Sequence, residues 1–306
     1  MQVQRSDPHP DSPGRCDQDT AGLIQERPLS LRRRLARLVR RPGSARRVLI
    51  CLLSVVGLAG ALGLLLQPMM RHDAMVRFDR ASGAFSLDRS PVTVAQFRSF
   101  AETTGWRVET DRQGGGLVIA LPLGRWSIDE AASWRAPWGS LRPGHTARDD
   151  DPVTQVSWND ADAYCRWAGK RLPSVDEWMH AAKAGNPEGA RYAVGASITA
   201  DGRYLAKVWS GDFPMYNDGA AGEVGAAPIG ATGLTPTGLT DMAGNVWNWM
   251  SDDRFDPALG AEAVQKALKG GSFLCDENVC RGYDIAARQS STPDTSAVHI
   301  GFRCAR

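Results

Sequence analysis

The chain has 306 residues, of which 42% are hydrophobic, and this composition excludes a largely disordered or fibrous protein. Its formal net charge is only +2 at pH 7, but eleven arginines are concentrated in residues 1–47, so the rest of the chain is mildly acidic. A mildly acidic body excludes nucleic acid as the expected main partner. The chain is long enough to form a domain with a substantial hydrophobic core.

The N-terminal part of the sequence predicts a tail followed by a membrane anchor. Residues 1–47 are basic and lack hydrophobic periodicity, which predicts a disordered tail. Residues 48–67 contain the uncharged run VLICLLSVVGLAGALGLLL, which as a helix is long enough to cross a bilayer. Because the arginines precede this run, the positive-inside rule places the N-terminus in the cytoplasm.

A cleaved signal peptide is the alternative to an uncleaved signal anchor. The apolar run is longer than a usual signal-peptide core, and the QPMMRHDAM that follows has no clear small-residue cleavage site. The expectation is therefore a single-pass inner-membrane protein with its body in the periplasm or another extracytoplasmic compartment. Disulfides are permitted in such a compartment.

Residues 75–306 are predicted to form one globular domain with few regular elements. Helices are expected after the capping-box sequences at Thr93 and Ser174, and from Ser157, where apolar residues recur at helical spacing. The expected helix ends are Gly105, Gly169 and Gly185. The run LVIALPL at 117–123 predicts a strand. The remaining sequence is irregular and rich in glycine, which is typical of long binding loops.

Three of the six cysteines lie in the C-terminal stretch 269–306. Two of them, Cys275 and Cys280, are separated by only four residues. Two thiols at this spacing can form a redox pair, a disulfide, or a two-sulfur site for a soft metal such as Cu(I). The spacing alone leaves these three alternatives open.

Five sequence blocks occur in the order of a known family. They are RSPVTVAQFRSFAETTGW (89–106), PVTQVSWNDADAYCRWAGKRLPSVDEW (152–178), VWSGDFP (208–214), GLTDMAGNVWNW (238–249) and the C-terminal pattern GGSFLC…C…AAR…TPDTS…GFRCA. In these blocks the chain resembles the formylglycine-generating enzymes, also called sulfatase-modifying factors. The resemblance covers essentially all of 75–306 and implies the family's α+β fold, which is C-type lectin-like and low in regular secondary structure. The expected fold class is this fold preceded by one N-terminal transmembrane helix.

The resemblance also implies a function. It predicts a copper-dependent oxidase that uses O2 to convert a peptidyl cysteine, in a Cys-x-Pro-x-Arg segment of an exported sulfatase-like protein, to formylglycine. The expected partners are this peptide segment and, through the anchor, the membrane, but not nucleic acid. Two alternatives remain open. One is an oxidative maturation or accessory factor for another periplasmic protein, such as copper nitrite reductase; the other is a non-catalytic module that binds copper or a peptide.

Four residues take catalytic positions by this resemblance. Cys275 and Cys280 match the two thiolates that bind Cu(I), an ion for which soft sulfur ligands are selective. Ser272 matches the active-site serine, and Trp247 matches a tryptophan beside the site. We expect Ser272 to position the substrate and Trp247 to form a wall of the site.

The resemblance implies structural roles for other residues. Cys165 and Cys304 match a disulfide pair, and closing so long a loop is worth about 5 kcal/mol in the chain-entropy model. The expected ligands of one Ca²⁺ are Asp241, Gly244, Val246 and Asn248, in which hard oxygen atoms would surround the ion. At the family's other calcium site, Lys207 and Ala221 replace ligands, so that site is expected to be lost, with the Lys207 ammonium in place of the ion.

The expected substrate groove departs from the family pattern. The residues expected to line it are Asp276, Glu277, Ser291 and His299. Asp276 and Glu277 stand where a histidine and an arginine are common, and this exchange predicts a more acidic entrance that would favour a cationic peptide.

Overall fold

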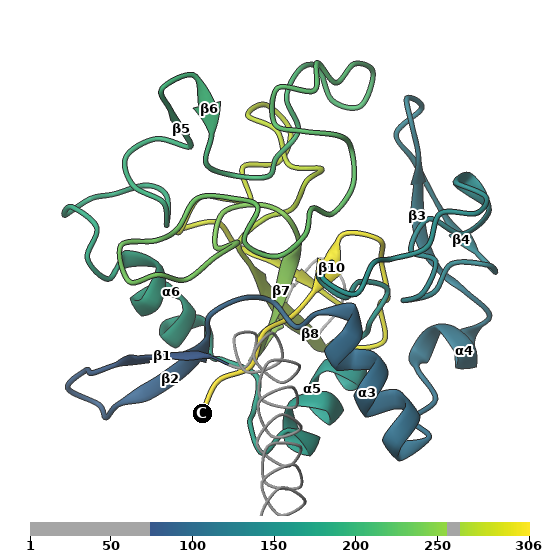
Figure 1. Ribbon diagram of the computed structural model, residues 1–306, viewed down its shortest axis with the longest axis horizontal. Coiled ribbons are helices and arrows are strands. Elements are labelled where there is room, and N and C mark those ends of the chain that lie inside the picture. The colour runs from purple at the N-terminus through teal and green to yellow at the C-terminus, as the bar shows by residue number, and fades with distance from the viewer. Residues whose placement is uncertain (1–73, 256–263) are drawn as a thin grey trace, which may run out of the picture. The chain divides into compact units, whose positions relative to one another are not determined.

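The computed structural model describes residues 74–255 and 264–306 (Figure 1). The tail expected over 1–47 and the anchor expected over 48–67 lie outside the described residues. The longest described helix has 11 residues, whereas about 20 are needed to cross a bilayer core. The part of the chain that the structure describes contains no helix long and apolar enough to span a membrane. This finding corrects the expected transmembrane helix and the single-pass inner-membrane localisation derived from it: the described residues support neither.

Three helices begin at side-chain caps, as the sequence predicts. They are α3 (Val94–Thr104), α5 (Trp158–Trp167) and α6 (Val175–Lys183). In each, the hydroxyl of the residue before the helix accepts a hydrogen bond from a main-chain N–H of the first turn, which satisfies an otherwise unpaired donor. α3 ends at Gly105, whose φ of 67° suits glycine. Two short helices were not predicted: α4 (Glu109–Gln113) and the 3₁₀ helix η1 (Gly139–Leu141).

The largest sheet in the described ranges has four strands in the order β10-β7-β8-β9. These strands are β10 (Ile300–Gly301), β7 (Trp247–Phe255), β8 (Val264–Lys269) and β9 (Gln289–Ser291). β10 pairs with β7 in parallel, and the other two pairings are antiparallel. Because β10 pairs with the first two residues of β7, residues far apart in the sequence meet at one end of this sheet (Figure 1).

Three antiparallel strand pairs accompany the sheet. They are β1 (Met75–Phe78) with β2 (Phe85–Asp88), β3 (Gly116–Ala120) with β4 (Arg125–Asp129), and β5 (Thr199–Ala200) with β6 (Arg203–Tyr204). β3 is the strand predicted over 117–123, but it ends at Ala120, before Pro122, because proline has no N–H to donate to a partner strand.

α3 and α5 lie side by side (Figure 1), and aromatic side chains pack around them. The Phe97 ring lies 5.6 Å from that of Trp134 and 6.0 Å from that of Tyr164, and Phe302 packs on Tyr164 at 5.3 Å. The buried Trp249 of β7 donates from Nε1 to the Val156 oxygen at 3.1 Å. This core connects the two helices to the strands that carry the site.

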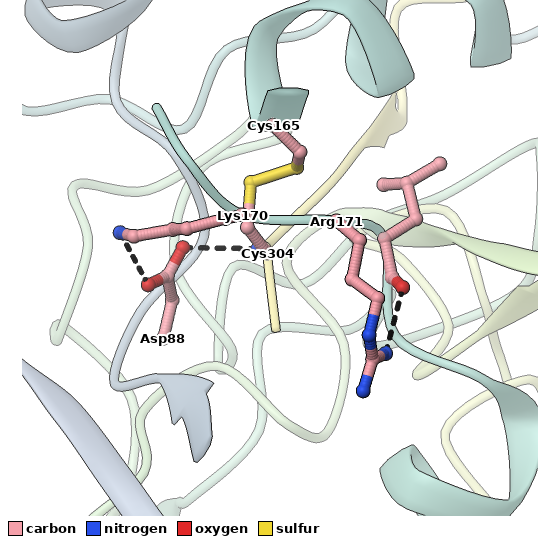
Figure 2. Close-up of a disulfide and its surroundings, with 6 residues drawn as sticks. Asp88, Cys165, Lys170, Arg171 and Cys304 are labelled. Carbon is pink, nitrogen blue, oxygen red and sulfur yellow. Dashed lines mark hydrogen bonds and ion pairs between the residues drawn. A yellow bond between two sulfur atoms is a disulfide. The ribbon is translucent and has the colours of Figure 1, made fainter. Parts of the chain in front are cut away.

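The C-terminal residues are bound into the domain by a disulfide. Figure 2 shows Cys165, on α5, bonded to Cys304; their Cα atoms are 5.7 Å apart. Beside it, the Lys170 ammonium donates to one oxygen of Asp88 at 2.8 Å, and the other oxygen accepts the Cys304 N–H at 2.9 Å. Burial raises the pKa of Asp88, although Lys170 opposes this effect. The disulfide and the buried ion pair therefore both hold the C-terminal segment around Cys304.

Candidate active site

Cys275 and Cys280 lie in the wall of a cavity of about 650 Å³. Its lining also includes Ser272, Trp247, Trp126, Phe213 and His299. Ser272 and the two cysteines follow β8, Trp247 begins β7, and His299 directly precedes β10. The pairing of β7 with both β10 and β8 therefore brings three separate segments of the sequence to one site.

The structure pairs the two cysteines as a disulfide, with Cα atoms 4.7 Å apart. Cys275 is buried and Cys280 is partly exposed. The main chain of Cys275 is fixed on both sides, because its N–H donates to the Ser272 oxygen at 3.0 Å and its oxygen accepts the Trp209 N–H at 2.9 Å. One buried and one partly exposed cysteine thus line the same cavity.

Ser272 and Trp247 lie next to this pair. Ser272 is fully buried; its Oγ is 4.0 Å from the Cys275 sulfur and accepts the Leu274 N–H at 3.3 Å. The Trp247 ring packs against Gly282, where a Cβ would overlap the ring and lie 3.0 Å from the Cys275 sulfur. The sequence did not predict a role for Gly282. Glycine is needed there because of a contact with Trp247, a residue 35 positions earlier in the chain.

His299 lines the cavity and also a neighbouring one of about 250 Å³, in which Ser291 lies. Its ring is tilted against the Trp126 ring, with centroids 4.9 Å apart. Its Nδ1 has no hydrogen-bond partner among the described residues. Burial lowers the pKa of His299 to about 4, so the imidazole is neutral at pH 7. His299 therefore contributes a polar but uncharged ring to the cavity.

The two acidic residues expected at the entrance are placed differently. Asp276 is buried, and its carboxylate accepts the N–H groups of Val279 and Cys280. Glu277 is exposed, and neither residue is among those that line the cavity. The charged lining residues are instead Arg281, Asp284 and Arg288. The expected acidic entrance is not formed by these side chains, because the loop turns Asp276 toward its own main chain.

At two of the residues expected to bind calcium, Asp241 and Val246, the oxygen atoms accept hydrogen bonds from the protein. The Asp241 carboxylate accepts from Gly230 N–H and from the side chains of Thr232 and Asn245. The Val246 oxygen accepts from the Asn248 amide at 2.8 Å. Within 74–255 and 264–306, no group of three His, Cys, Asp or Glu residues is placed to hold a metal ion. Asp241 and Val246 thus already have hydrogen-bond donors within the protein, which a calcium ion bound by this set would have to displace.

Lys207, which the resemblance predicts to replace an ion at a lost calcium site, is bound by main-chain oxygens. Lys207 is buried, and its Nζ donates to the main-chain oxygens of Ala221, at 3.0 Å, and Glu223. Burial lowers its pKa to about 8. An internal cation therefore binds the carbonyl groups of this loop.

The chain is similar to several known proteins. Residues 71–306 match the family model described as the sulfatase-modifying factor enzyme 1-like domain. The chain is 41% identical to the formylglycine-generating enzyme of Streptomyces coelicolor over 246 residues, which cover 72% of this chain and 77% of that protein. It is 34% identical over 265 residues to the formylglycine-generating enzyme of Bos taurus, covering 78% and 70% of the two chains. It is also 33% identical over 241 residues to a protein of Bos taurus named inactive C-alpha-formylglycine-generating enzyme 2, covering 72% and 76%.

Proposed function

Because the chain belongs to the sulfatase-modifying factor family, whose formylglycine-generating enzymes oxidise a peptidyl cysteine with O2, we propose that it performs this conversion with copper bound by Cys275 and Cys280. The proposed substrate is a Cys-x-Pro-x-Arg segment of a sulfatase-like protein. An exported location of that protein depended on the corrected membrane prediction and is not part of the proposal.

The observation that carries this proposal is the pair of neighbouring sulfur atoms in the wall of a cavity large enough for a peptide side chain. When both thiols are reduced, they form a soft donor set that fits Cu(I). The bound ion would supply a site at which a substrate thiolate and O2 can react. The accessible side of Cys280 leaves the approach to this site open.

The surrounding residues have separate roles. The Ser272 hydroxyl lies beside the Cys275 sulfur, where it can donate a hydrogen bond to a thiolate. The Trp247 ring, which packs on Gly282 beside the Cys275 sulfur, can limit the access of water to the pair. The uncharged His299 ring and Trp126 form another part of the lining, where they can orient the peptide.

The electron balance of the reaction defines the assay. Replacing the C–S bond of the substrate by an aldehyde removes two electrons and releases sulfide. Reduction of O2 to water takes up four electrons, so two added thiol groups must supply the other two as they form a disulfide.

The test uses the full chain, reduced and loaded with Cu(I), with O2, dithiothreitol and a Cys-x-Pro-x-Arg peptide, analysed by mass spectrometry. We expect the mass loss of thiol-to-aldehyde conversion in the wild type and its loss in Cys275→Ser and Cys280→Ser. Cys16→Ser, which changes a thiol outside the proposed site, should remain active. Tight Cu(I) binding without conversion would favour a non-catalytic copper-binding module, and conversion by both site variants would exclude the copper mechanism.

A further inference from the structure

The loop between the two cysteines is held by one buried side chain. Asp276 is only 3% exposed, and its Oδ1 accepts the Val279 N–H at 2.7 Å and the Cys280 N–H at 3.3 Å. A carboxylate that accepts main-chain N–H groups three and four residues ahead closes a turn in the same way as a helix N-cap. The Asp276 side chain therefore fixes the conformation of the chain that leads to Cys280.

The two cysteines are fixed by different contacts. Cys275 is bound to Ser272 and Trp209 through its own main chain, independently of the turn that follows it. Cys280 is bound through its N–H to Asp276. Because Cys275 is already fixed, the distance between the two sulfur atoms depends on the turn that Asp276 closes.

Neighbouring residues of the loop do not share this role. Glu277 and Asn278 are exposed, and it is the main-chain oxygen of Glu277, not its carboxylate, that accepts from Arg281 Nε at 2.7 Å. Asp276 is thus the acidic residue of the loop whose side chain points inward.

We propose that Asp276 is a positioning residue for Cys280, which holds the second thiol at the distance from Cys275 that a shared ligand or a disulfide requires. Its importance for catalysis rests on the proposed function, whereas its effect on the thiol pair does not. This role requires an acceptor oxygen at the distance from the main chain that an aspartate side chain gives. Asparagine at this position should therefore replace aspartate, whereas glutamate, which is one methylene longer, should not.

The thiol pair itself provides the measurement. In a glutathione buffer, the reduced pair and one oxidised glutathione exchange to give the Cys275–Cys280 disulfide and two reduced glutathione molecules. The equilibrium constant of this exchange reports how closely the two thiols are held. It is read from the alkylated and disulfide-bonded forms of the 275–280 peptide after digestion of the quenched full-length protein, which separates this pair from Cys165 and Cys304.

We expect Asp276→Asn to keep the equilibrium constant within about threefold of the wild type. Asp276→Ala and Asp276→Glu should lower it about tenfold, because they lose the hydrogen bonds that close the turn. Asn278→Ala, an exposed change in the same turn, should have no effect. If Asp276→Ala does not fold, the comparison of Asn with Glu still decides the result. Equal constants for Asn and Glu, or a glutamate variant that matches the wild type while the asparagine variant does not, would overturn the proposal.

The same variants distinguish this role from the proposed function. If the wild type does not convert the peptide but the thiol equilibrium changes as expected, the proposed function fails and the role of Asp276 stands. If the wild type converts the peptide and no Asp276 variant changes the thiol equilibrium, the proposed function stands and the role of Asp276 fails.

Discussion

The guanidinium of Arg303 donates from Nε to the side-chain oxygen of Asn248 at 2.7 Å. Its Nη2 donates to the main-chain oxygens of Thr240, at 2.9 Å, and Asp241, at 3.0 Å. Arg303 is fully buried, and burial lowers its pKa to about 10, which leaves it charged at neutral pH. A side-chain cation therefore binds the loop for which calcium was expected.

We predict that calcium does not stabilise this protein. The unfolding temperature should change by less than about 1 °C between excess EDTA and millimolar CaCl2, because a ligand stabilises only where the native state offers it a site. Arg303→Met should lower the free energy of unfolding by about 3–5 kcal/mol, since it leaves the loop oxygens without their donor. A rise of several degrees in calcium would show that the loop opens to bind the ion.

Lys207 should make stability depend on pH in the alkaline range. Its pKa is about 8 in the folded protein and 10.5 ordinarily, so between these values the unfolded chain binds more protons than the folded one. Stability then rises with pH across this interval, and the contribution is lost as pH falls through about 8. The free energy of unfolding of the wild type, minus that of Lys207→Met, should increase from pH 7.5 to pH 10 in urea titrations. A constant or falling difference would contradict the prediction.

Gly282→Ala should displace Trp247 or Cys275, because the new methyl group has no space between them. Overpacking of this kind costs about 1–3 kcal/mol, and peptide conversion should fall more steeply than stability. Gly219→Ala provides the control, since its positive φ of 76° is strained for alanine but no atom lies near the added Cβ. The control should lose some stability in urea and keep its activity; equal activity losses in both variants would argue against a local effect.

Lys170→Met should destabilise the protein by about 3–5 kcal/mol, because it leaves the Asp88 carboxylate buried without its cation. The double variant Asp88→Asn with Lys170→Met removes the charge as well and should recover much of the loss. Urea unfolding of the two variants measures this difference. A double variant less stable than Lys170→Met would show that Asp88 acts mainly through its bond to Cys304.

Local chemistry made part of this fold predictable. The caps of α3 and α6 depend on residues three positions apart, so Thr93 with Gln96 and Ser174 with Glu177 could be read directly from the sequence. Cys275 and Cys280 were found in the same way, because two thiols close in sequence must also be close in space.

The roles of Asp276 and Arg303 could not be predicted in this way. An aspartate in an irregular loop can face a substrate or its own main chain, and only the folded turn decides between them. Arg303 meets Asn248 across 55 positions of sequence, through a parallel pairing of β7 and β10 that no local pattern indicates.

The contacts of the C-terminal residues have a consequence for synthesis on the ribosome. Ala305 bridges to both Leu87 and Arg171, and the Cys304 N–H meets Asp88 across 216 positions. The first hairpin and α5 thus acquire their shared partner only after Cys304 has left the exit tunnel. Until then the apolar cluster that contains Leu87 lacks Ala305. Chaperones can bind this exposed apolar surface while the rest of the domain is being translated.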